Sequence, residues 1–302
     1  MTLSIQEVIR QIPAWSGHQV IFEPLGGGLT NTNYRVEVDG APCVVRIPGA
    51  STDLLAVDRK NEHYNTVAAA QAGVGPRVLH YLPQECVMVL EFISGTTMSN
   101  AALRSPGMPG RMARSLRQLH AGPRFLTEFN MFRLVEFYLR MAEEHQVRVP
   151  SGYPEERPTV ERIERAVRVH ALPSVPCHND LLAENYIDDG QRLRLIDFEY
   201  SGNNDPCFEL GNTCQELGYD PDQFAELCRE YFGEVRRFQL ARMHLYALMS
   251  DVGWTLWGAI QAKVSKLDYD FWGYCQTRWE RARQVIHSTA FGRWLQDSAG
   301  QD

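Results

Sequence analysis

The sequence lacks a surplus of positive charge and a long hydrophobic run. Its 30 Lys and Arg residues stand against 37 Asp and Glu residues, which leaves a formal net charge of −7. A chain with this balance has no general attraction for nucleic acid phosphates, so we expect no nucleic-acid partner. The longest apolar stretch, residues 240–260, is interrupted by Arg242, His244 and Asp251 and is too polar for a bilayer span. We therefore also expect no membrane insertion.

Paired cysteines are absent as well. The seven cysteines are odd in number and scattered, and none forms a C-x-x-C pair, so their spacing indicates neither a disulfide framework nor a zinc site. Residues 1–7 lack the basic and apolar regions of a signal peptide. These absences are typical of a cytoplasmic protein with reduced thiols, and we expect that location.

The composition that is present is that of an ordinary globular protein, with 44% hydrophobic and 22% charged residues. A length of 302 residues suggests one large domain or two closely associated lobes. The sequence pattern changes near residues 92–95. We therefore predict an N-terminal lobe over residues 1–93 and a C-terminal lobe over residues 94–302.

The N-terminal lobe is predicted to be a small antiparallel sheet with one helix. The Asp39-Gly40 pair lies between two alternating runs and predicts a hairpin over residues 34–47. Further strands are expected over residues 19–22, 77–81 and 86–92, and a helix is expected over residues 58–72.

The C-terminal lobe is predicted to be mostly helical, because apolar residues recur at three- and four-residue steps. One island between residues 175 and 200 contains strand-like runs around a polar loop. The expected fold class is therefore α+β, with a small antiparallel β lobe and a larger helical lobe. The predicted helices cover residues 111–120, 132–145, 155–170, 222–232, 235–261 and 269–294, and the strand-like runs cover 175–177 and 193–196.

The polar loop of this island carries the most informative residues. Asp180 is followed five residues later by Asn185, and Asp197 comes twelve residues beyond that. A carboxylate base and two oxygen ligands for a hard cation are the set that phosphoryl transfer from a nucleotide requires. Asp and Asn also populate loops because they favour turns, but this order and spacing favour the catalytic interpretation. We predict Asp180 as the base and Asn185 and Asp197 as Mg²⁺ ligands.

The N-terminal lobe offers residues for the nucleotide phosphates. The Gly-rich turn over residues 25–33 would let the backbone close over phosphates. Arg46 lies on a strand and Glu62 on the next helix, where a cation can contact the phosphates and a carboxylate can steady it. Each feature alone is more often an ordinary turn or an exposed charge. The expected contacts on the turn are Gly27, Gly28, Thr30 and Asn31.

With these motifs the chain resembles the choline/ethanolamine kinase family, within the aminoglycoside phosphotransferase-like group of the protein-kinase-like fold. The resemblance implies a bilobal enzyme that uses ATP and Mg²⁺. It also implies that His178 belongs to the catalytic set, and that Glu199 joins the metal ligands where protein kinases have Gly. It runs from Gly26 to about Arg278 and rests on the Gly-rich turn, on residues 45–47, on His178-Asn179-Asp180 with Asn185, and on residues 196–200.

The same resemblance implies an acceptor site near the C-terminus. Trp254 and Trp257 are three residues apart, so they face the same direction on one predicted helix. Aromatic faces attract quaternary ammonium groups, although such a pair is often part of a core. With Tyr274 as a third ring and Glu216 as a carboxylate, these residues form the predicted amino-alcohol site.

The leading hypothesis is a kinase that phosphorylates the hydroxyl of choline. Ethanolamine, thiamine or another amino alcohol is the alternative substrate, because residues 181–183 depart from the family pattern and the fold does not fix the acceptor. A non-catalytic nucleotide-binding pseudokinase is an alternative of a different class, and the joint presence of Asp180, Asn185 and Asp197 argues against it. The sequence decides neither ATP against GTP nor the oligomeric state.

Overall fold

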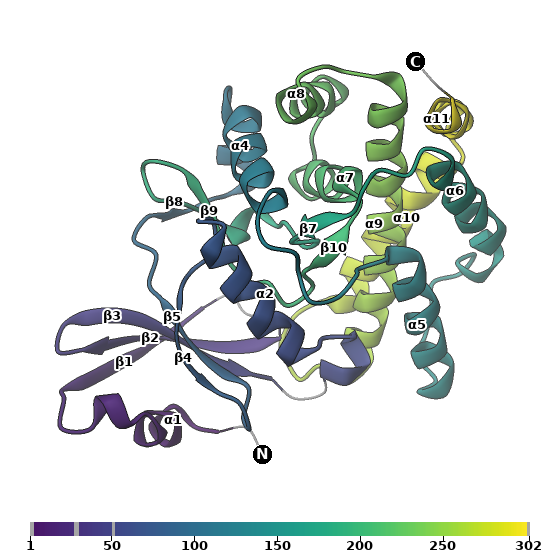
Figure 1. The fold of residues 1–302 in the computed structure, drawn as a ribbon. Helices are drawn as coiled ribbons and strands as arrows, with labels where there is room; N and C mark the ends of the chain where they lie inside the picture. The colour runs from purple at the N-terminus through teal and green to yellow at the C-terminus, as the bar shows by residue number, and fades with distance from the viewer. Residues whose placement is uncertain (1–2, 27–29, 50–51, 301–302) are drawn as a thin grey trace.

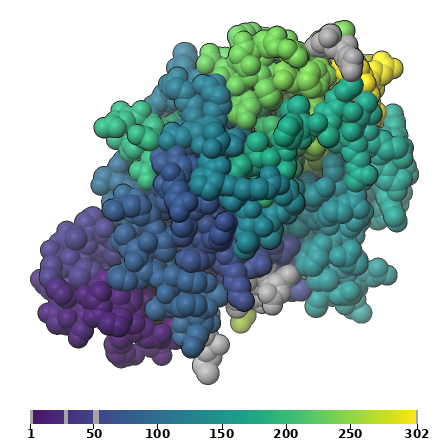
Figure 2. Space-filling view, viewed as in Figure 1, coloured from purple at the N-terminus to yellow at the C-terminus, as the bar shows by residue number. Residues whose placement is uncertain are grey.

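The computed structural model describes residues 3–26, 30–49 and 52–300. A twisted sheet built from N-terminal residues lies at one end of the molecule, and a larger group of helices lies at the other (Figure 1). The space-filling view shows the same division, with the purple N-terminal residues at one end and the green and yellow residues at the opposite end (Figure 2). This is the α+β arrangement that the sequence predicts. The boundary at residue 93 itself stays a prediction.

A five-stranded antiparallel sheet forms the N-terminal lobe, in the order β1-β2-β3-β5-β4. The predicted hairpin is confirmed, because Tyr34 pairs with Val45 across the ladder. Its turn residues Asp39 and Gly40 have φ angles of 49° and 83°, the left-handed values that a type I′ turn requires. The strands are β1 (Val20–Leu25), β2 (Asn31–Val38), β3 (Ala41–Pro48), β4 (Val78–Leu82) and β5 (Val87–Glu91).

The predicted helix of this lobe is α2 (Arg59–Gln71). Asp58 caps it by accepting hydrogen bonds from the N–H groups of Lys60 and Asn61. The 3₁₀ turn η2 (Thr52–Leu55) precedes it. α2 passes between the sheet and the helices of the second lobe, so its residues can contact both (Figure 1).

Helix α1 (Ile5–Gln11) is not among the elements predicted from the sequence. This helix begins at a capping box, in which Ser4 and Glu7 satisfy each other's backbone N–H groups. Ile5 and Val8 are buried with the strand residues of the sheet. At seven residues the helix is too short for its apolar period to stand out. The 3₁₀ turn η1 (Pro13–Trp15) follows it.

The C-terminal lobe is built around α9 (Arg237–Val264), a helix of 28 residues that packs against α5, α7, α10 and α11. Most of its residues from Gln239 to Gln261 are buried, which explains its nearly continuous apolar pattern. Among the described residues, no helix combines the length and the hydrophobicity that a bilayer crossing needs. The other helices are α3 (Asn100–Leu103), α4 (Met108–His120), α5 (Met131–Glu144), α6 (Arg157–Val169), α7 (Pro206–Leu217), α8 (Pro221–Phe232), α10 (Phe271–Ile286) and α11 (Thr289–Ala299), and the 3₁₀ turn η3 (Pro154–Glu156) precedes α6.

Two of the longer helices of this lobe differ from the sequence predictions, and the short elements α3, β6 (Thr96–Thr97), β8 (Tyr186–Asp188) and β10 (Gly202–Asn204) are not among the predicted ones. The single helix expected over residues 269–294 is wrong: α10 ends at the C-cap His287, and α11 starts anew after Ser288. The sequence analysis also does not predict α7. Asp205 caps that helix by accepting from the N–H of Cys207, and Pro206 occupies its first turn, where proline needs no hydrogen-bond partner.

The predicted strand island is confirmed and forms two small sheets. β7 pairs with β10, while β6, β8 and β9 form a three-stranded sheet. α2 fastens this island to the first lobe, because the side-chain amides of Asn61 and Asn65 donate to the carbonyl of Ser201 at 2.9 and 3.1 Å. The strands are β6 (Thr96–Thr97), β7 (Val175–Cys177), β8 (Tyr186–Asp188), β9 (Leu193–Leu195) and β10 (Gly202–Asn204).

Candidate active site

A cavity of about 360 Å³ is lined by residues of both lobes. Its walls come from the Gly-rich turn, the loop after β7, the loop after β9, and the helices α7, α9 and α10. Most residues predicted from the sequence therefore share one cavity. The lining residues are Thr30, Asp180, Leu182, Glu184, Asn185, Asp197, Glu199, Tyr200, Glu216, Trp254, Trp257, Tyr269, Tyr274 and Arg278.

Asp180 and Asn185 lie on the loop between β7 and β8. The side-chain amide of Asn185, at the end of the 3₁₀ turn η4 (Ala183–Asn185), donates to the backbone carbonyl of Asp180 at 2.8 Å. This bond closes the loop and leaves the amide oxygen of Asn185 available as a ligand. Burial, together with the carboxylates of Glu216 and Asp197, raises the pKa of Asp180 well above its ordinary value. A carboxylate with a raised pKa is a stronger base.

Glu209 of α7 holds the backbone of this loop. Its fully buried carboxylate accepts hydrogen bonds from the N–H groups of His178 at 2.8 Å and Asn179 at 2.7 Å. Asn179 has a φ of 67°, a left-handed conformation that Asn tolerates better than most residues. Its side-chain amide donates to the carbonyl of Tyr200 at 3.1 Å, which fixes that conformation.

His178 does not line the cavity. Its side chain is buried, with Nε2 2.7 Å from the carbonyl oxygen of Ile196 and its ring centroid 4.8 Å from that of Phe198. Burial lowers the pKa of His178, so the neutral ring donates its Nε2–H to that carbonyl. These contacts tie the Asp180 loop to the segment that leads to Asp197. They favour a positioning role over contact with the reacting atoms.

Arg46 of β3 meets three carboxylates. Its Nε lies 3.0 Å from Oε1 of Glu62, so the predicted pair between strand and helix is present. Its Nη2 donates to Asp197 and lies 3.5 Å from Oε2 of Glu199. Burial alone would raise the pKa of Asp197, but Arg46 outweighs it and lowers the pKa below its ordinary value. Asp197 also has a left-handed φ of 70°, which aims the carboxylate from a tight turn.

The Gly-rich turn contacts Glu199 directly. The hydroxyl of Thr30 donates to Oε1 of Glu199 at 2.7 Å, and the amide of Asn31 donates to Oε2 at 2.9 Å. Burial, reinforced by the charge of Asp197, raises the pKa of Glu199 to about 7. The predicted contacts Gly27 and Gly28 lie outside the described residues.

The sequence analysis does not single out Arg59. Its Nη1 lies 2.7 Å from Oε2 of Glu62 and 3.3 Å from Oε2 of Glu199. The sequence feature that could have indicated Arg59 is its position three residues before Glu62, which places both residues on one face of the first turn of α2. No sequence spacing connects either residue with Glu199, because that contact depends on how the lobes pack.

Asn185, Asp197 and Glu199 fit a hard cation. All three line the cavity, and each offers an oxygen ligand of the kind that Mg²⁺ takes. Arg46 and Arg59 contact the carboxylates of Glu62, Asp197 and Glu199. The formal charges of these five side chains leave one negative charge unbalanced. Mg²⁺ held here with a nucleotide would neutralise phosphate charge.

Trp254 and Trp257 of α9 form a second wall. Both are largely buried, with 3% and 7% of their surfaces exposed, yet both line the cavity. The ring N–H of Trp254 donates to Asn212 at 3.3 Å, and that of Trp257 donates to the hydroxyl of Tyr200 at 2.8 Å. Tyr274 stands edge-on to Trp257 with ring centroids 5.6 Å apart. Because the protein satisfies both ring N–H groups, these tryptophans contribute aromatic surface rather than donors.

Glu216 adds a carboxylate to this aromatic wall. Its Oε2 accepts a hydrogen bond from Arg278 at 2.6 Å, while its Oε1 is buried without a hydrogen-bond partner among the described residues. Arg278 also lies 3.2 Å from Asp251 and 4.6 Å from the ring centroid of Tyr274. A buried acceptor of this kind is costly unless a donor or a positive charge approaches it.

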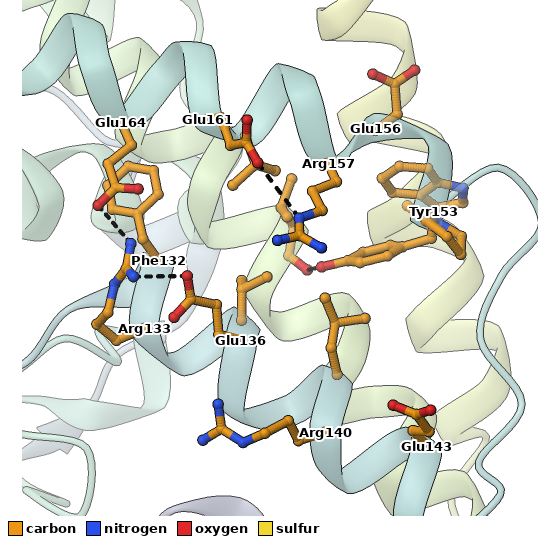
Figure 3. A pocket seen from close by; sticks show the side chains of 16 residues that line it. Phe132, Arg133, Glu136, Arg140, Glu143, Tyr153, Glu156, Arg157, Glu161 and Glu164 are labelled. Atoms are coloured by element: carbon orange, nitrogen blue, oxygen red, sulfur yellow. Dashed lines mark hydrogen bonds and ion pairs between the residues drawn. The ribbon is translucent and has the colours of Figure 1, made fainter.

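A second cavity of about 470 Å³ lies between α5 and α6 (Figure 3). Its lining includes the apolar rings of Phe132 and Tyr153, and Arg133 on its rim pairs with Glu136 at 2.7 Å and Glu164 at 2.6 Å. No residue of the predicted site lines it. Although this cavity is the larger of the two, the predicted site residues line the smaller one.

The smaller cavity is lined by the predicted base Asp180 and the predicted cation ligands Asn185, Asp197 and Glu199. The buried pair of Arg46 and Glu62 adjoins it through the contact of Arg46 with Asp197. Around the cavity stand a small antiparallel lobe and a larger helical lobe. This combination defines the class of protein, which is a phosphotransferase with the bilobal protein-kinase-like fold.

Known proteins agree with this class. Residues 21–246 match the phosphotransferase enzyme family. Ethanolamine kinase 2 from Rattus norvegicus is 27% identical in an alignment that covers 92% of this chain and 80% of that protein. A choline/ethanolamine kinase family protein from Mesorhizobium loti has a similar structure, with a TM-score of 0.85 and 36% identity over 97% of both chains.

A more distant likeness supports the fold. Choline kinase LicA from Streptococcus pneumoniae has a TM-score of 0.78 at 23% identity, over 93% of this chain and 98% of that one. A further structure of LicA was solved in complex with AMP. The chain belongs to the phosphotransferase enzyme family, as a phosphotransferase of the choline/ethanolamine kinase type.

Proposed function

We propose that this protein transfers the γ-phosphoryl group of ATP to the hydroxyl group of choline. The observation that carries this proposal is that Asp180 lines the same cavity as Trp254, Trp257 and Tyr274. A small amino alcohol has a hydroxyl at one end and a positive charge at the other. The cavity offers a base for the first and aromatic faces for the second.

In the proposed reaction the acceptor hydroxyl lies against Asp180. The hydroxyl oxygen forms a bond to the γ-phosphorus, the bond from that phosphorus to the bridging oxygen breaks, and ADP leaves. Asp180 accepts the hydroxyl proton, for which its raised pKa suits it. Asn185, Asp197 and Glu199 are the proposed Mg²⁺ ligands.

The N-terminal lobe is proposed to hold the phosphates. Arg46 supplies the cation, and Glu62 keeps its guanidinium in place through the contact at 3.0 Å. The proposed phosphate contacts on the turn are Gly27, Gly28, Thr30 and Asn31, and in the structure the side-chain donors of Thr30 and Asn31 are directed to Glu199. The AMP bound to LicA supports an adenine nucleotide as the donor.

Choline recognition follows from what a trimethylammonium group can and cannot do. It has no N–H to donate, so ring faces, dispersion and a nearby negative charge must hold it. Trp254, Trp257 and Tyr274 line the cavity and are proposed to supply such faces, and the proposed negative charge is that of Glu216, which also pairs with Arg278. We therefore assign the ammonium of choline to this wall.

Ethanolamine is the second candidate, and one observation favours it. Oε1 of Glu216 is buried without a hydrogen-bond partner among the described residues, and a primary ammonium could donate to it where choline could not. Ethanolamine kinase 2 of Rattus norvegicus also acts, by its name, on that substrate. The two candidates differ only in how many methyl groups the nitrogen carries.

A methylation series separates the candidates. ADP release would be measured with ethanolamine, N-methylethanolamine, N,N-dimethylethanolamine, choline and thiamine at saturating Mg²⁺–ATP. The choline proposal predicts that kcat/KM rises with each methyl group and is about tenfold or more higher for choline than for ethanolamine, or about 1.4 kcal/mol in transition-state energy. A steady fall along the series would identify ethanolamine as the substrate. Tight Mg²⁺–ATP binding without turnover of any acceptor would favour the pseudokinase instead.

A further inference from the structure

His120, Cys177 and Glu209 meet behind the catalytic loop, outside the cavity. His120 lies at the end of α4, Cys177 ends β7, and Glu209 lies on α7. All three are buried, and one nitrogen, one sulfur and one oxygen atom from them lie within 4.8 Å of one another. Because the three residues are far apart in the sequence, cysteine spacing alone cannot indicate this cluster.

The two separations from His120 in this cluster match those between ligand atoms of a tetrahedral zinc site. Nε2 of His120 lies 3.7 Å from Sγ of Cys177 and 3.5 Å from Oε1 of Glu209. With Zn–N of about 2.05 Å, Zn–S of about 2.3 Å and Zn–O of about 2.1 Å, neighbouring ligand atoms lie about 3.6 Å (N to S) and about 3.4 Å (N to O) apart. As a direct hydrogen bond the nitrogen–oxygen contact is long, since N–H···O bonds rarely exceed about 3.2 Å.

The charges of this cluster also suit a divalent cation. A thiolate from Cys177 and the carboxylate of Glu209 carry two negative charges, which cancel those of Zn²⁺ and leave a neutral buried complex. Binding forms a Zn–S bond and releases the thiol proton to solvent. The nitrogen, sulfur and oxygen donor set is typical of zinc rather than of Mg²⁺.

A neighbouring residue orients the histidine for such a role. Nδ1 of His120 lies 2.7 Å from the hydroxyl of Tyr231, whose ring centroid is 5.4 Å from that of His120. When Nδ1–H donates to this hydroxyl, Nε2 presents its lone pair toward Cys177 and Glu209. Metal-bound histidines are commonly fixed by a partner on their other ring nitrogen in this way.

We propose that His120, Cys177 and Glu209 bind one zinc ion. The ion ties α4, β7 and α7 together at a point where Glu209 also holds the N–H groups of His178 and Asn179. It therefore braces the backbone of the catalytic loop from the side opposite the cavity. The proposal does not depend on which acceptor the enzyme phosphorylates.

Cobalt substitution tests this site. The chain would be produced in cobalt-supplemented minimal medium, desalted, and examined for metal content and for the near-ultraviolet absorption of a cobalt–thiolate bond. We expect about one cobalt per chain with that absorption in the wild type, and a drop of about tenfold or more in retained cobalt in Cys177→Ser and in His120→Gln. Cys207→Ser is the matched control, because Cys207 is equally buried but lies outside the cluster.

The outcomes that would overturn the proposal are separate from those that test catalysis. A wild type without cobalt above background would refute the site, as would thiolate absorption that persists in Cys177→Ser. Cobalt that lacks thiolate absorption and is lost in Asp197→Ala would place the metal in the cavity instead. His120→Gln keeps every cysteine, so it decides the matter if Cys177→Ser fails to fold.

Discussion

Arg46 and Glu62 form a buried ion pair, with Nε of the arginine 3.0 Å from Oε1 of the glutamate and only 6% and 1% of the two residues exposed. The pair joins β3 to α2. Because the same guanidinium also donates to Asp197, it links the helix, the sheet and the proposed metal ligand. Its geometry therefore connects the orientation of α2 with the nucleotide site.

Arg46→Lys is expected to raise the KM for ATP. The guanidinium contacts several carboxylate oxygens through separate N–H donors, and the single ammonium group of lysine cannot reproduce that planar arrangement of donors. Steady-state kinetics at varied Mg²⁺–ATP would measure the change. Arg35→Lys is the control, because Arg35 pairs with Glu37 on the same sheet, whereas Arg46 contacts Asp197 and Glu199 of the cavity lining. Unchanged kinetics in Arg46→Lys would remove Arg46 from the phosphate site.

The nucleotide half of the site shows what a sequence can and cannot predict. The pairing of Arg46 with Glu62 is predictable, because a strand cation followed by a helix carboxylate is a recognisable order. The contact of Arg59 with Glu199 is not predictable, since 140 residues separate them and only the packing of the two lobes brings them together. The short helix α1 is not predicted, because seven residues are too few for a helical periodicity of apolar residues to be recognised.

Trp257→Leu and Trp254→Leu are expected to raise the choline KM by roughly two- to thirtyfold each. Each cation–π contact contributes about 0.5–2 kcal/mol, and leucine keeps an apolar side chain while removing the ring quadrupole. Trp272→Leu is the control, since Trp272 stacks against Arg148 and does not line the cavity. Choline KM and the thermal midpoint would be measured on the same proteins.

Trp254 and Trp257 could instead serve only to pack the hydrophobic core, and the same experiment tests that alternative. If they served only as core, both variants would lose thermal stability while the choline KM of the folded enzyme stayed the same. The sequence cannot distinguish the two roles, because a Trp pair on one helix face is common in cores. In the structure both are largely buried and both line the cavity, so a loss of stability should accompany the change in KM.

His244 should make the stability of the protein depend on pH. Its ring stacks between Phe224 and Trp294, with both centroid distances 4.3 Å. Burial, with a smaller effect of Arg293, lowers its pKa to about 4 from an ordinary value of 6.5. Between pH 6.5 and pH 4 the His244 side chain is therefore protonated in the unfolded chain but neutral in the native state. The free energy of unfolding falls as the pH falls through that range.

The size of this effect can be measured by denaturant titration at several pH values. His244 should contribute a loss of roughly 3 kcal/mol between pH 7 and pH 4. His244→Phe keeps an aromatic ring in the stack and removes the titrating group, so the variant should lose that part of the pH dependence. Equal slopes in the two proteins would show that the pKa of His244 is the same in the native and unfolded states, which would contradict the lowered pKa.

The catalytic loop shows a further limit of the sequence. Asp180, Asn185 and Asp197 are predicted from order and spacing, and all three line one cavity. The support of that loop is not predicted, because Glu209 lies on α7, whose apolar pattern does not stand out. His178 lies two residues before Asp180 in the sequence, but its side chain is directed to the carbonyl of Ile196, and only the structure reveals this.

Asp180→Asn tests the central claim most directly, since Asp180 is proposed to accept the proton of the acceptor hydroxyl and not to hold the nucleotide. Turnover with choline and calorimetric Mg²⁺–ATP affinity would be measured on the variant, with the exposed Asp222→Asn as the control. The account predicts a turnover lower by about 10²–10⁴-fold with nucleotide affinity nearly unchanged. Turnover close to that of the wild type would contradict it.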